Sequence, residues 1–273
     1  MKTRRSLFQL FLILMTFPSL IIWIGERTLS EAAQSENNGE DSARYNQALQ
    51  IAEGVLTQLG DIFAQLDKEP MQNREDAQQA VASGFIIILP ELLKGDEKHA
   101  QELGFHTGKD TPIEKIIQGA ELLDYAFPVF EIHLNDLRTF SPGTGKDVKQ
   151  LLFYANQLLW PISVDEKVQS SLTIRFTPNE QKKAGRTWRP TRWGRPNLIR
   201  QLTTAREIAN QKRGFLVSVP SLNRNFFGYN DNTIIKFVPL VTDRLFKKGE
   251  SLSAEYAYEL LSDEAKNVDD SPR

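Results

Sequence analysis

The sequence predicts an α+β protein: a mostly antiparallel sheet with helices on one face, preceded by a helical N-terminal region. Helical periodicity dominates up to about residue 126, whereas apolar and alternating runs of strand type dominate from residue 127 to about residue 240. Helix-rich and strand-rich portions that segregate along a chain favour α+β over alternating α/β architecture. The apolar and charged fractions, 40% and 25%, are those of an ordinary globular protein.

Five regions are expected along the 273 residues. They are a signal peptide or membrane anchor (1–32), a flexible polar linker (33–42), a mainly helical region (43–126), a sheet-rich α+β domain (127–262) and a polar tail (263–273).

The N-terminus has the composition of an export segment. Residues 2–5 are KTRR, and an apolar stretch from Ser6 to Gly25 follows them. Pro18 inside this stretch and the small residues up to Ala32 favour a signal peptide cleaved after Ala32 or nearby. The apolar length, about 18–19 residues, nevertheless suffices to span a bilayer. Either outcome predicts an extracytoplasmic protein, which is periplasmic or secreted if cleaved and anchored in the inner membrane through residues 7–25 if not.

The first part of the mature chain is expected to be helical. Apolar residues between Leu49 and Leu66 recur every three or four positions, which predicts a helix with one apolar face. Asp41 or Ser42 suits its N-cap, and it should end near residue 67. A second, more polar helix is expected over 73–82.

A short apolar run and a third helix follow. The run Gly84–Pro90, rich in β-branched residues and bounded by Gly and Pro, is interpreted as a buried strand. Residues 91–104 are expected to be helix or loop. Thr111 and Pro112 suit the N-cap and first position of a helix that continues to about residue 123.

The sheet-rich domain alternates strands with two helices and ends in a third. Residues 168–176 place every second side chain on one face, the clearest strand signal in the chain. The expected elements are a strand at Val129–Leu134, a helix at Asp147–Leu159, a hairpin of Ile162–Val164 with Val168–Phe176, a helix at Asn197–Gln211, a strand at Phe215–Val219, a hairpin of Asn225–Tyr229 with Thr233–Val238, and a helix at Ser253–Lys266.

The stretch Asn179–Arg200, NEQKKAGRTWRPTRWGRPNLIR, has the most biased composition in the chain. It is strongly basic against a single acid, Glu180, and two prolines stiffen it. Guanidinium groups bind phosphate or carboxylate bidentately and stack on indole rings, so this stretch is the best candidate for recognising an anion. The candidate anion- or partner-binding residues are Lys182, Lys183, Arg186, Trp188, Arg189, Arg192, Trp193, Arg195 and Arg200.

A purely structural interpretation of the same stretch also stands. Its arginines would then pair with the protein's own acids, and its tryptophans would cap the edge of the sheet. Arg189, Arg192 and Arg195 are spaced by three. A regular strand would split them between its faces, whereas an extended prolyl segment would present them together.

Other candidate sites are weaker. Glu131 and His133 lie two apart on the expected strand, so they would share a face and could do acid–base work in a pocket. His99 and Glu102 have metal-ligand spacing, but His106 lies seven residues beyond His99 and HExxH is absent.

The remaining patterns indicate turns rather than sites. Residues 141–146, SPGTGK, lack the first glycine and the final Ser or Thr of a phosphate-binding loop. Nucleophilic serine motifs are absent. Asn223, Arg224 and Asn225 form a secondary polar cluster with Tyr229, Asn230 and Asn232, although hairpin turns explain several of these asparagines.

Composition narrows the classes of function. The chain has no cysteine, which excludes disulfides, thiolate nucleophiles and Cys-ligated metal sites. Its net charge of −2 argues against a nucleic-acid-binding protein. No cofactor, metal or catalytic residue is predicted.

The sequence is thus interpreted as an exported, non-catalytic binding or interaction protein of the cell envelope, whose partner is an envelope protein or an anionic lipid or polymer. The alternative is a hydrolase-like envelope enzyme with a non-standard site near Glu131 and His133. The ligand and the oligomeric state are left open.

Overall fold

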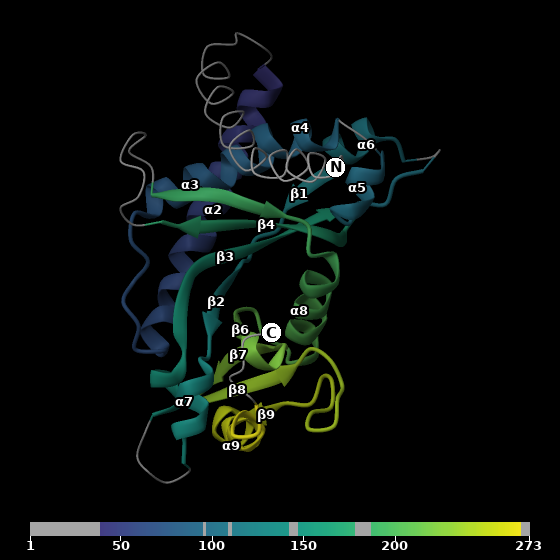
Figure 1. Cartoon of the computed structure of the whole chain (residues 1–273). Helices are drawn as coiled ribbons and strands as arrows, with labels where there is room; N and C mark the ends of the chain where they lie inside the picture. The colour runs from purple at the N-terminus through teal and green to yellow at the C-terminus, as the bar shows by residue number, and fades with distance from the viewer. Residues whose placement is uncertain (1–38, 95–96, 109–110, 142–146, 178–186, 269–273) are drawn as a thin grey trace, which may run out of the picture. The chain divides into compact units, whose positions relative to one another are not determined.

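The computed structural model describes residues 39–94, 97–108, 111–141, 147–177 and 187–268 (Figure 1). The predicted export segment, most of the predicted linker and the candidate residues Lys182, Lys183 and Arg186 lie outside these ranges. Residues Tyr45–Arg273 form one compact unit. Within the described ranges, the helices are all too short or too polar to cross a bilayer.

Helix α2 (Gly39–Gln65) and helix α3 (Arg74–Ser83) match the first two predicted helices. The apolar face of α2 is buried as its periodicity predicts, with Ala52, Leu59 and Phe63 all less than 4% exposed.

The predicted strand over 84–90 is wrong. Gly84–Ile88 forms a π-helical turn that continues directly into α4 (Leu89–Leu93). Phe85, Leu89 and Leu93 are buried at a spacing of four, which is helical spacing. The β-branched residues favour a strand locally, but burial against the rest of the molecule decides the outcome. Gly84 allows this close packing, because a Cβ there would lie 3.1 Å from the Leu172 side chain.

Two short helices and a short strand come next. Helix α5 covers Glu97–Glu102, and α6 covers Ile113–Gly119. The N-cap of α6 is Pro112 rather than the expected Thr111. The helix also ends earlier than predicted, since Ala120–Leu122 form strand β1.

One mostly antiparallel sheet of nine strands organises the described part of the chain, and the predicted α+β class is confirmed. Its order is β5-β4-β3-β2-β6-β7-β8-β9, with β1 pairing with β3. Of the pairs, β2–β6 is parallel and the others are antiparallel. The strands are β2 (Phe127–Glu131), β3 (Phe153–Val164), β4 (Lys167–Phe176), β5 (Trp188–Trp193), β6 (Phe215–Val219), β7 (Arg224–Asp231), β8 (Ile234–Pro239) and β9 (Leu252–Ser253).

The predicted helix over 147–159 is also wrong. A single 3-10 turn, Val148–Leu151, precedes the long strand β3. Leu158 and Leu159 are both fully buried, which a helical pattern would explain. In the structure they point to opposite faces of the sheet, Leu158 into one core and Leu159 into another. A strand buried on both faces loses its alternation, and this made β3 resemble a helix.

Two apolar cores lie on the two faces of the sheet. The larger core contains buried residues of α2 to α6, of α7 (Leu134–Thr139) and of α9 (Ala254–Ala265). The smaller core packs α8 (Pro196–Ile208) through Ile199 and Leu202 against Phe127 and Phe227. Figure 1 shows α2 and α8 on opposite sides of the central strands. Most helices therefore share one face, while α8 covers the other.

Both predicted hairpins are confirmed. The β3–β4 turn lies at Asp165 and Glu166, whose φ angles of 50° and 60° suit a tight hairpin turn. β7 pairs with β8 across a turn that contains Asn232. The C-terminal helix begins where expected, because the Ser253 side chain accepts a hydrogen bond from the Tyr256 N–H.

Candidate anion-recognition edge

The predicted connection between β4 and α8 contains an additional strand. β5 stands at the end of the sheet order and pairs with β4. Trp188–Trp193, in the middle of the Arg/Trp-rich stretch, therefore form an edge of the sheet. Pro190 suits this position, since proline lacks the N–H that a central strand needs.

A β-bulge in β5 decides where the arginines point. Arg189 lies opposite Arg175 of β4, and Arg192 lies opposite Thr173. Arg175 and Thr173 are two residues apart on one strand, so all four side chains belong to the same face. The register shifts between these pairs, which leaves Thr191 as an extra residue. The bulge thus returns Arg192 to the face of Arg189, from which a regular strand would have turned it away.

The tryptophans occupy the opposite, inward face. Trp188 is only 2% exposed, lies opposite Phe176 and donates a hydrogen bond from Nε1 to the Gln72 carbonyl at 2.9 Å. Trp193 is half-buried and donates from Nε1 to the Gly84 carbonyl at 3.3 Å. The tryptophans therefore fasten the sheet edge to the helical region, as the structural interpretation expects.

Thr187 fixes the start of β5 from the same side. Its N–H and its Oγ1 hydrogen-bond to Asp76 Oδ2 at 2.5 and 2.8 Å. The Asn73 Nδ2 donates to the Thr187 Oγ1 at 2.9 Å. Because both partners lie at the start of α3, the edge strand has a fixed position on the fold.

Two of the arginines, Arg192 and Arg195, do not follow the structural interpretation. Arg192 and Arg195 are exposed, and neither forms an ion pair with a carboxylate of the described residues. Partial burial, together with the nearby positive charge of Arg192, lowers the pKa of the Arg195 guanidinium. Two like charges thus influence each other, and none of the described acids forms an ion pair with either.

The other candidate residues contribute less. Arg189 is half-buried and has an interaction partner. Arg200 lies inside α8, where it donates to the Pro196 carbonyl at 3.0 Å and to the Asn197 Oδ1 at 3.3 Å.

Arg175 is a candidate that sequence reasoning missed. It is exposed on β4 directly opposite Arg189. Its alternation within β4 was visible in the sequence, but its partner strand was not predicted. We call Arg175, Arg189, Arg192 and Arg195 the basic edge.

The N-terminus of α8 adds to the positive character of the basic edge. Arg195 is the N-cap residue of this 13-residue helix, and its first turn contains no acid. The partial positive charge of a helix N-terminus favours anions. Gly194, with φ of 99°, makes the sharp turn from β5 into the helix, a conformation that suits glycine.

The predicted acid–base pair lies elsewhere. β2 ends at Glu131, and His133 is not on the strand but at the N-cap of α7. The exposed His133 ring stacks on Phe153 at a centroid distance of 4.4 Å, and its Nδ1 lies 3.8 Å from Asp136 Oδ2. An enzymatic role of Glu131 and His133 stays a prediction.

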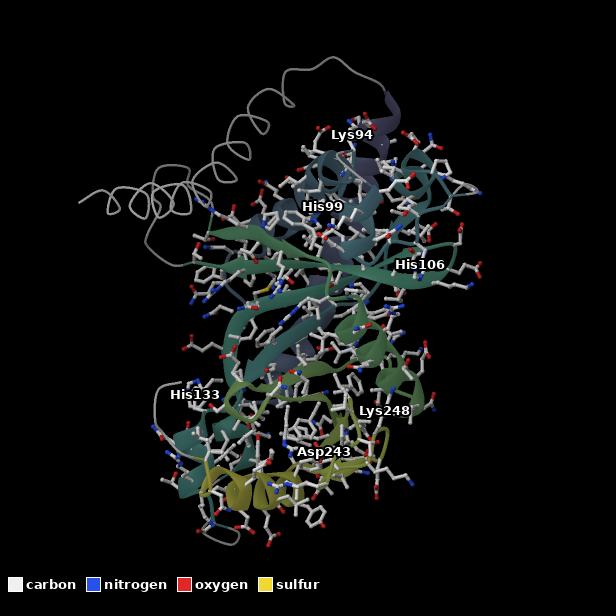
Figure 2. All side chains as sticks on the ribbon, turned by 45° about the vertical axis from the view of Figure 1, so that its right-hand side comes forward. Lys94, His99, His106, His133, Asp243 and Lys248 are labelled. Atoms are coloured by element: carbon white, nitrogen blue, oxygen red, sulfur yellow. The ribbon has the colours of Figure 1, made fainter. Side chains whose placement is uncertain are left out.

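The histidines do not converge on one site. His99 Nδ1 lies 3.7 Å from Glu102 Oε2 on α5, and the His106 backbone N–H donates to the Gln169 side chain. Figure 2 shows His133 well apart from both His99 and His106. Among the residues the structure describes, no group of three metal-ligating side chains comes together.

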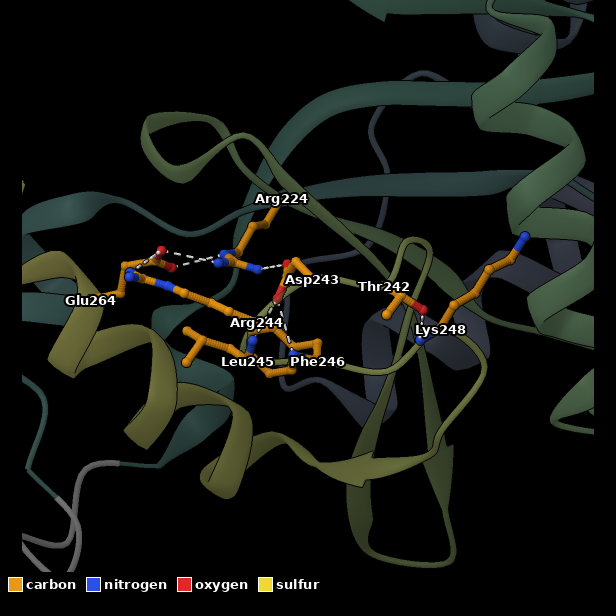
Figure 3. Close-up of polar contacts among 8 residues, drawn as sticks. All are labelled: Arg224, Thr242, Asp243, Arg244, Leu245, Phe246, Lys248 and Glu264. Atoms are coloured by element: carbon orange, nitrogen blue, oxygen red, sulfur yellow. Dashed lines mark hydrogen bonds and ion pairs between the residues drawn. The ribbon is translucent and has the colours of Figure 1, made fainter.

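A second arginine cluster lies at the start of β7 and uses acids of the protein itself. Arg224, 9% exposed, donates from Nε to Glu264 Oε2 at 2.8 Å and also pairs with Asp243 (Figure 3). Arg244 donates to the same Glu264 from the exposed side at 3.1 Å. We call Arg224, Asp243, Arg244 and Glu264 the C-terminal ion network.

The C-terminal ion network has a structural role. Asp243 Oδ1 accepts hydrogen bonds from the backbone N–H groups of Leu245 and Phe246, at 2.7 and 3.0 Å. The hydrogen bonds and ion pairs therefore join β7, the segment after β8 and helix α9. Arg224, which belonged to the secondary polar cluster in the sequence, is thereby explained.

Comparisons with protein-family models, with curated proteins and with solved structures find no match to this chain.

Proposed function

We propose that this chain is a non-catalytic binding protein of the cell envelope that recognises an anionic ligand or an acidic partner through the basic edge. The observation that carries the proposal is the pair Arg192 and Arg195. Both are exposed and close enough for one charge to affect the other, and neither is paired with a described carboxylate. Two adjacent guanidinium groups suit carboxylate or phosphate oxygens, which they bind with paired hydrogen bonds.

Recognition at this edge would use side chains rather than an added strand. A partner strand would need the outward N–H groups of β5, and Pro190 removes one of them. The bulge at Thr191 disturbs the ladder as well. Arg192, in contrast, stands on a strand whose inner face is anchored by Trp188, and Arg195 follows directly as the N-cap of α8. Such anchoring lowers the cost of ordering the binding groups.

The proposed location rests on the N-terminal sequence. Its basic residues followed by the apolar stretch Ser6–Gly25 support export. An exported chain would meet acidic proteins, anionic lipids and anionic polymers of the envelope, and not nucleic acid.

Binding of acidic probes to the full-length protein tests the proposal. Fluorescein-labelled poly-glutamate and labelled polyphosphate would be titrated with wild type and with the double variant Arg192→Glu/Arg195→Glu, using fluorescence anisotropy. We expect the variant to bind at least one probe more weakly by about tenfold or more, since exposed charges at an interface govern encounter and register. Wild-type binding should weaken as salt is added.

The matched control reverses two exposed lysines at the other end of the sheet. Lys247→Glu/Lys248→Glu has the same change in net charge but lies in the segment between β8 and β9. It should bind like wild type. If both double variants lose affinity equally, the effect comes from net charge and the proposed site is wrong.

A further inference from the structure

A polar groove separate from the basic edge lies beside the C-terminal half of α2. It has a volume of about 380 Å³, which lies within the range of small-molecule sites. One wall is formed by Asp61 and Gln65 of α2. The opposite wall is formed by the loop 210–214, which joins α8 to β6, and by Asn230 at the end of β7. We call it the α2–β7 groove.

Two cations face one acid in this groove. Lys212 and Arg213 are both exposed and both line the groove, and Arg213 forms an ion pair with Asp61. The side chains of Arg213 and Asp61 are 46% and 61% exposed, so their ion pair contributes little to stability. A ligand oxyanion can therefore replace Asp61 as the partner of Arg213 at little cost. The α2–β7 groove therefore has a surplus of positive charge that suits an oxyanion.

Asn230 adds a hydrogen-bond acceptor. Its Oδ1 is buried and has no hydrogen-bond partner among the described residues. A buried acceptor without a partner is unfavourable, and Asn230 also lines the groove. A turn of its side chain towards the groove would therefore let a ligand donate a hydrogen bond to this oxygen. A hydroxyl group supplies such a donor. Hairpin turn chemistry explains Asn232 but leaves this oxygen unaccounted for.

The loop that carries the cations is held in place. The Arg206 guanidinium lies over the Tyr125 ring, 3.6 Å from its centroid, and donates from Nη1 to the Lys212 carbonyl at 3.4 Å. Gly214 ends the loop where a Cβ would collide with the Phe227 ring, so the backbone approaches the core closely. Lys212 and Arg213 are thus fixed between two anchored points.

We propose that the α2–β7 groove binds a small hydroxylated oxyanion, that is, a sugar acid or a sugar phosphate. Lys212 and Arg213 hold the carboxylate or phosphate, and Asn230 accepts a hydrogen bond from a hydroxyl group. The amides of Gln65 and Asn210 also line the groove and suit further hydroxyl groups.

Isothermal titration of the full-length protein with four probes tests the chemistry. Glucuronate and glucose 6-phosphate carry both an oxyanion and hydroxyl groups, whereas glucose lacks the oxyanion and acetate lacks the hydroxyl groups. At least one of the two sugar anions should bind about tenfold or more tightly than glucose and acetate, because losing a paired group leaves its protein partner unsatisfied. Which of them binds identifies the oxyanion.

Two variants test the assigned residues. Lys212→Gln/Arg213→Gln should weaken binding of the sugar anion by about tenfold or more, while Lys247→Gln/Lys248→Gln removes two exposed lysines elsewhere and should not. Asn230→Ala should weaken binding of the sugar anion without lowering the urea midpoint of unfolding, since its Oδ1 bonds no described residue. A residue with only a structural role would lower the midpoint instead.

Several outcomes overturn the proposal. One is that neither sugar anion binds more tightly than glucose and acetate. Another is that Lys212→Gln/Arg213→Gln binds like wild type. A third is that Asn230→Ala binds like wild type. Arg192→Gln/Arg195→Gln should leave this binding intact, so failure at the basic edge and failure at the α2–β7 groove are distinguishable.

Discussion

The basic edge and the C-terminal ion network place arginines towards opposite ends of one sheet, in opposite electrostatic surroundings. Arg224 is 9% exposed and sits between Glu264 and Asp243, which both contact it directly. Arg192 and Arg195 are exposed, neither forms an ion pair with a described carboxylate, and the charge of Arg192 lowers the pKa of Arg195. Among the described residues, Arg224 is thus paired with carboxylates, whereas Arg192 and Arg195 are not.

This difference separates structural arginines from candidate binding arginines better than composition does. A buried guanidinium must be paired, since an isolated buried charge is strongly unfavourable. An exposed one needs no partner to remain folded, so its charge stays available to a ligand. The same distinction applies within the Arg/Trp-rich stretch. Its tryptophans form hydrogen bonds on the inner face and have a structural role, whereas its exposed arginines point outward.

Replacing Arg224 should have the largest effect. Arg224→Ala leaves Glu264 and Asp243 without their shared partner, and we expect a loss of about 3–5 kcal/mol in the free energy of unfolding, measured with urea. Arg244→Ala is the control. Its side chain is 73% exposed, so about 1 kcal/mol or less should be lost. Equal losses in the two variants would contradict the distinction between buried and exposed partners.

Acid should weaken the C-terminal ion network next. The hydrogen bond from Arg224, followed by the positive charges of Arg224 and Arg244, holds the pKa of the Glu264 carboxyl below its ordinary value. Its stabilisation is therefore present above the unfolded-state pKa and is lost as pH falls through the lower folded-state pKa.

The variant Glu264→Gln isolates this contribution. It should lose about 1–3 kcal/mol at neutral pH. Urea unfolding from neutral pH to about pH 3 should then show a shallower loss of stability in the variant than in wild type. Parallel pH profiles would show that Glu264 contributes nothing to acid sensitivity.

Neutralising the basic edge should have the smallest effect on stability. Burial and the neighbouring charge both disfavour the charged form of Arg195 in the folded protein. We therefore expect Arg192→Gln/Arg195→Gln to unfold within about 0.5 kcal/mol of wild type in urea, with any change towards greater stability. A clear loss would mean that these arginines have structural partners, and the contrast with Arg224 would fail.

Much of the fold could be predicted from local sequence. The apolar stripe of α2, the alternation of β4 and the turns of both hairpins are local signals, and the structure confirms them. The errors at 84–90 and 147–159 have different local causes. Gly84–Pro90 is so short and so uniformly apolar that its pattern does not distinguish helix from strand. Leu158 and Leu159 face the two cores, so neighbouring positions of this strand are both apolar.

The candidate site could be predicted only in part. Composition identified Arg192, Arg195, Trp188 and Trp193, but a list of residue types does not say which face each side chain takes. The face of each side chain became clear only from the pairing of β5 with β4. The same pairing placed Arg175 opposite Arg189 and so added it to the basic edge. The α2–β7 groove joins segments far apart in sequence, and only Tyr229 and Asn230, from the secondary polar cluster, gave a local signal of it.

The bulge at Thr191 has a consequence for the length of the edge strand. The side chains of β5 alternate between the inner and outer faces of the sheet only when Thr191 is left out of the count. The bulge takes up this extra residue, so the pairing with β4 continues in phase on both sides of it. Deleting Thr191 would leave a regular strand with the same residues inside and outside. A second deletion from the strand would find no extra residue to absorb it and would exchange the two faces beyond it. The strand can thus lose Thr191 and still present the same arginines outward and the same tryptophans inward.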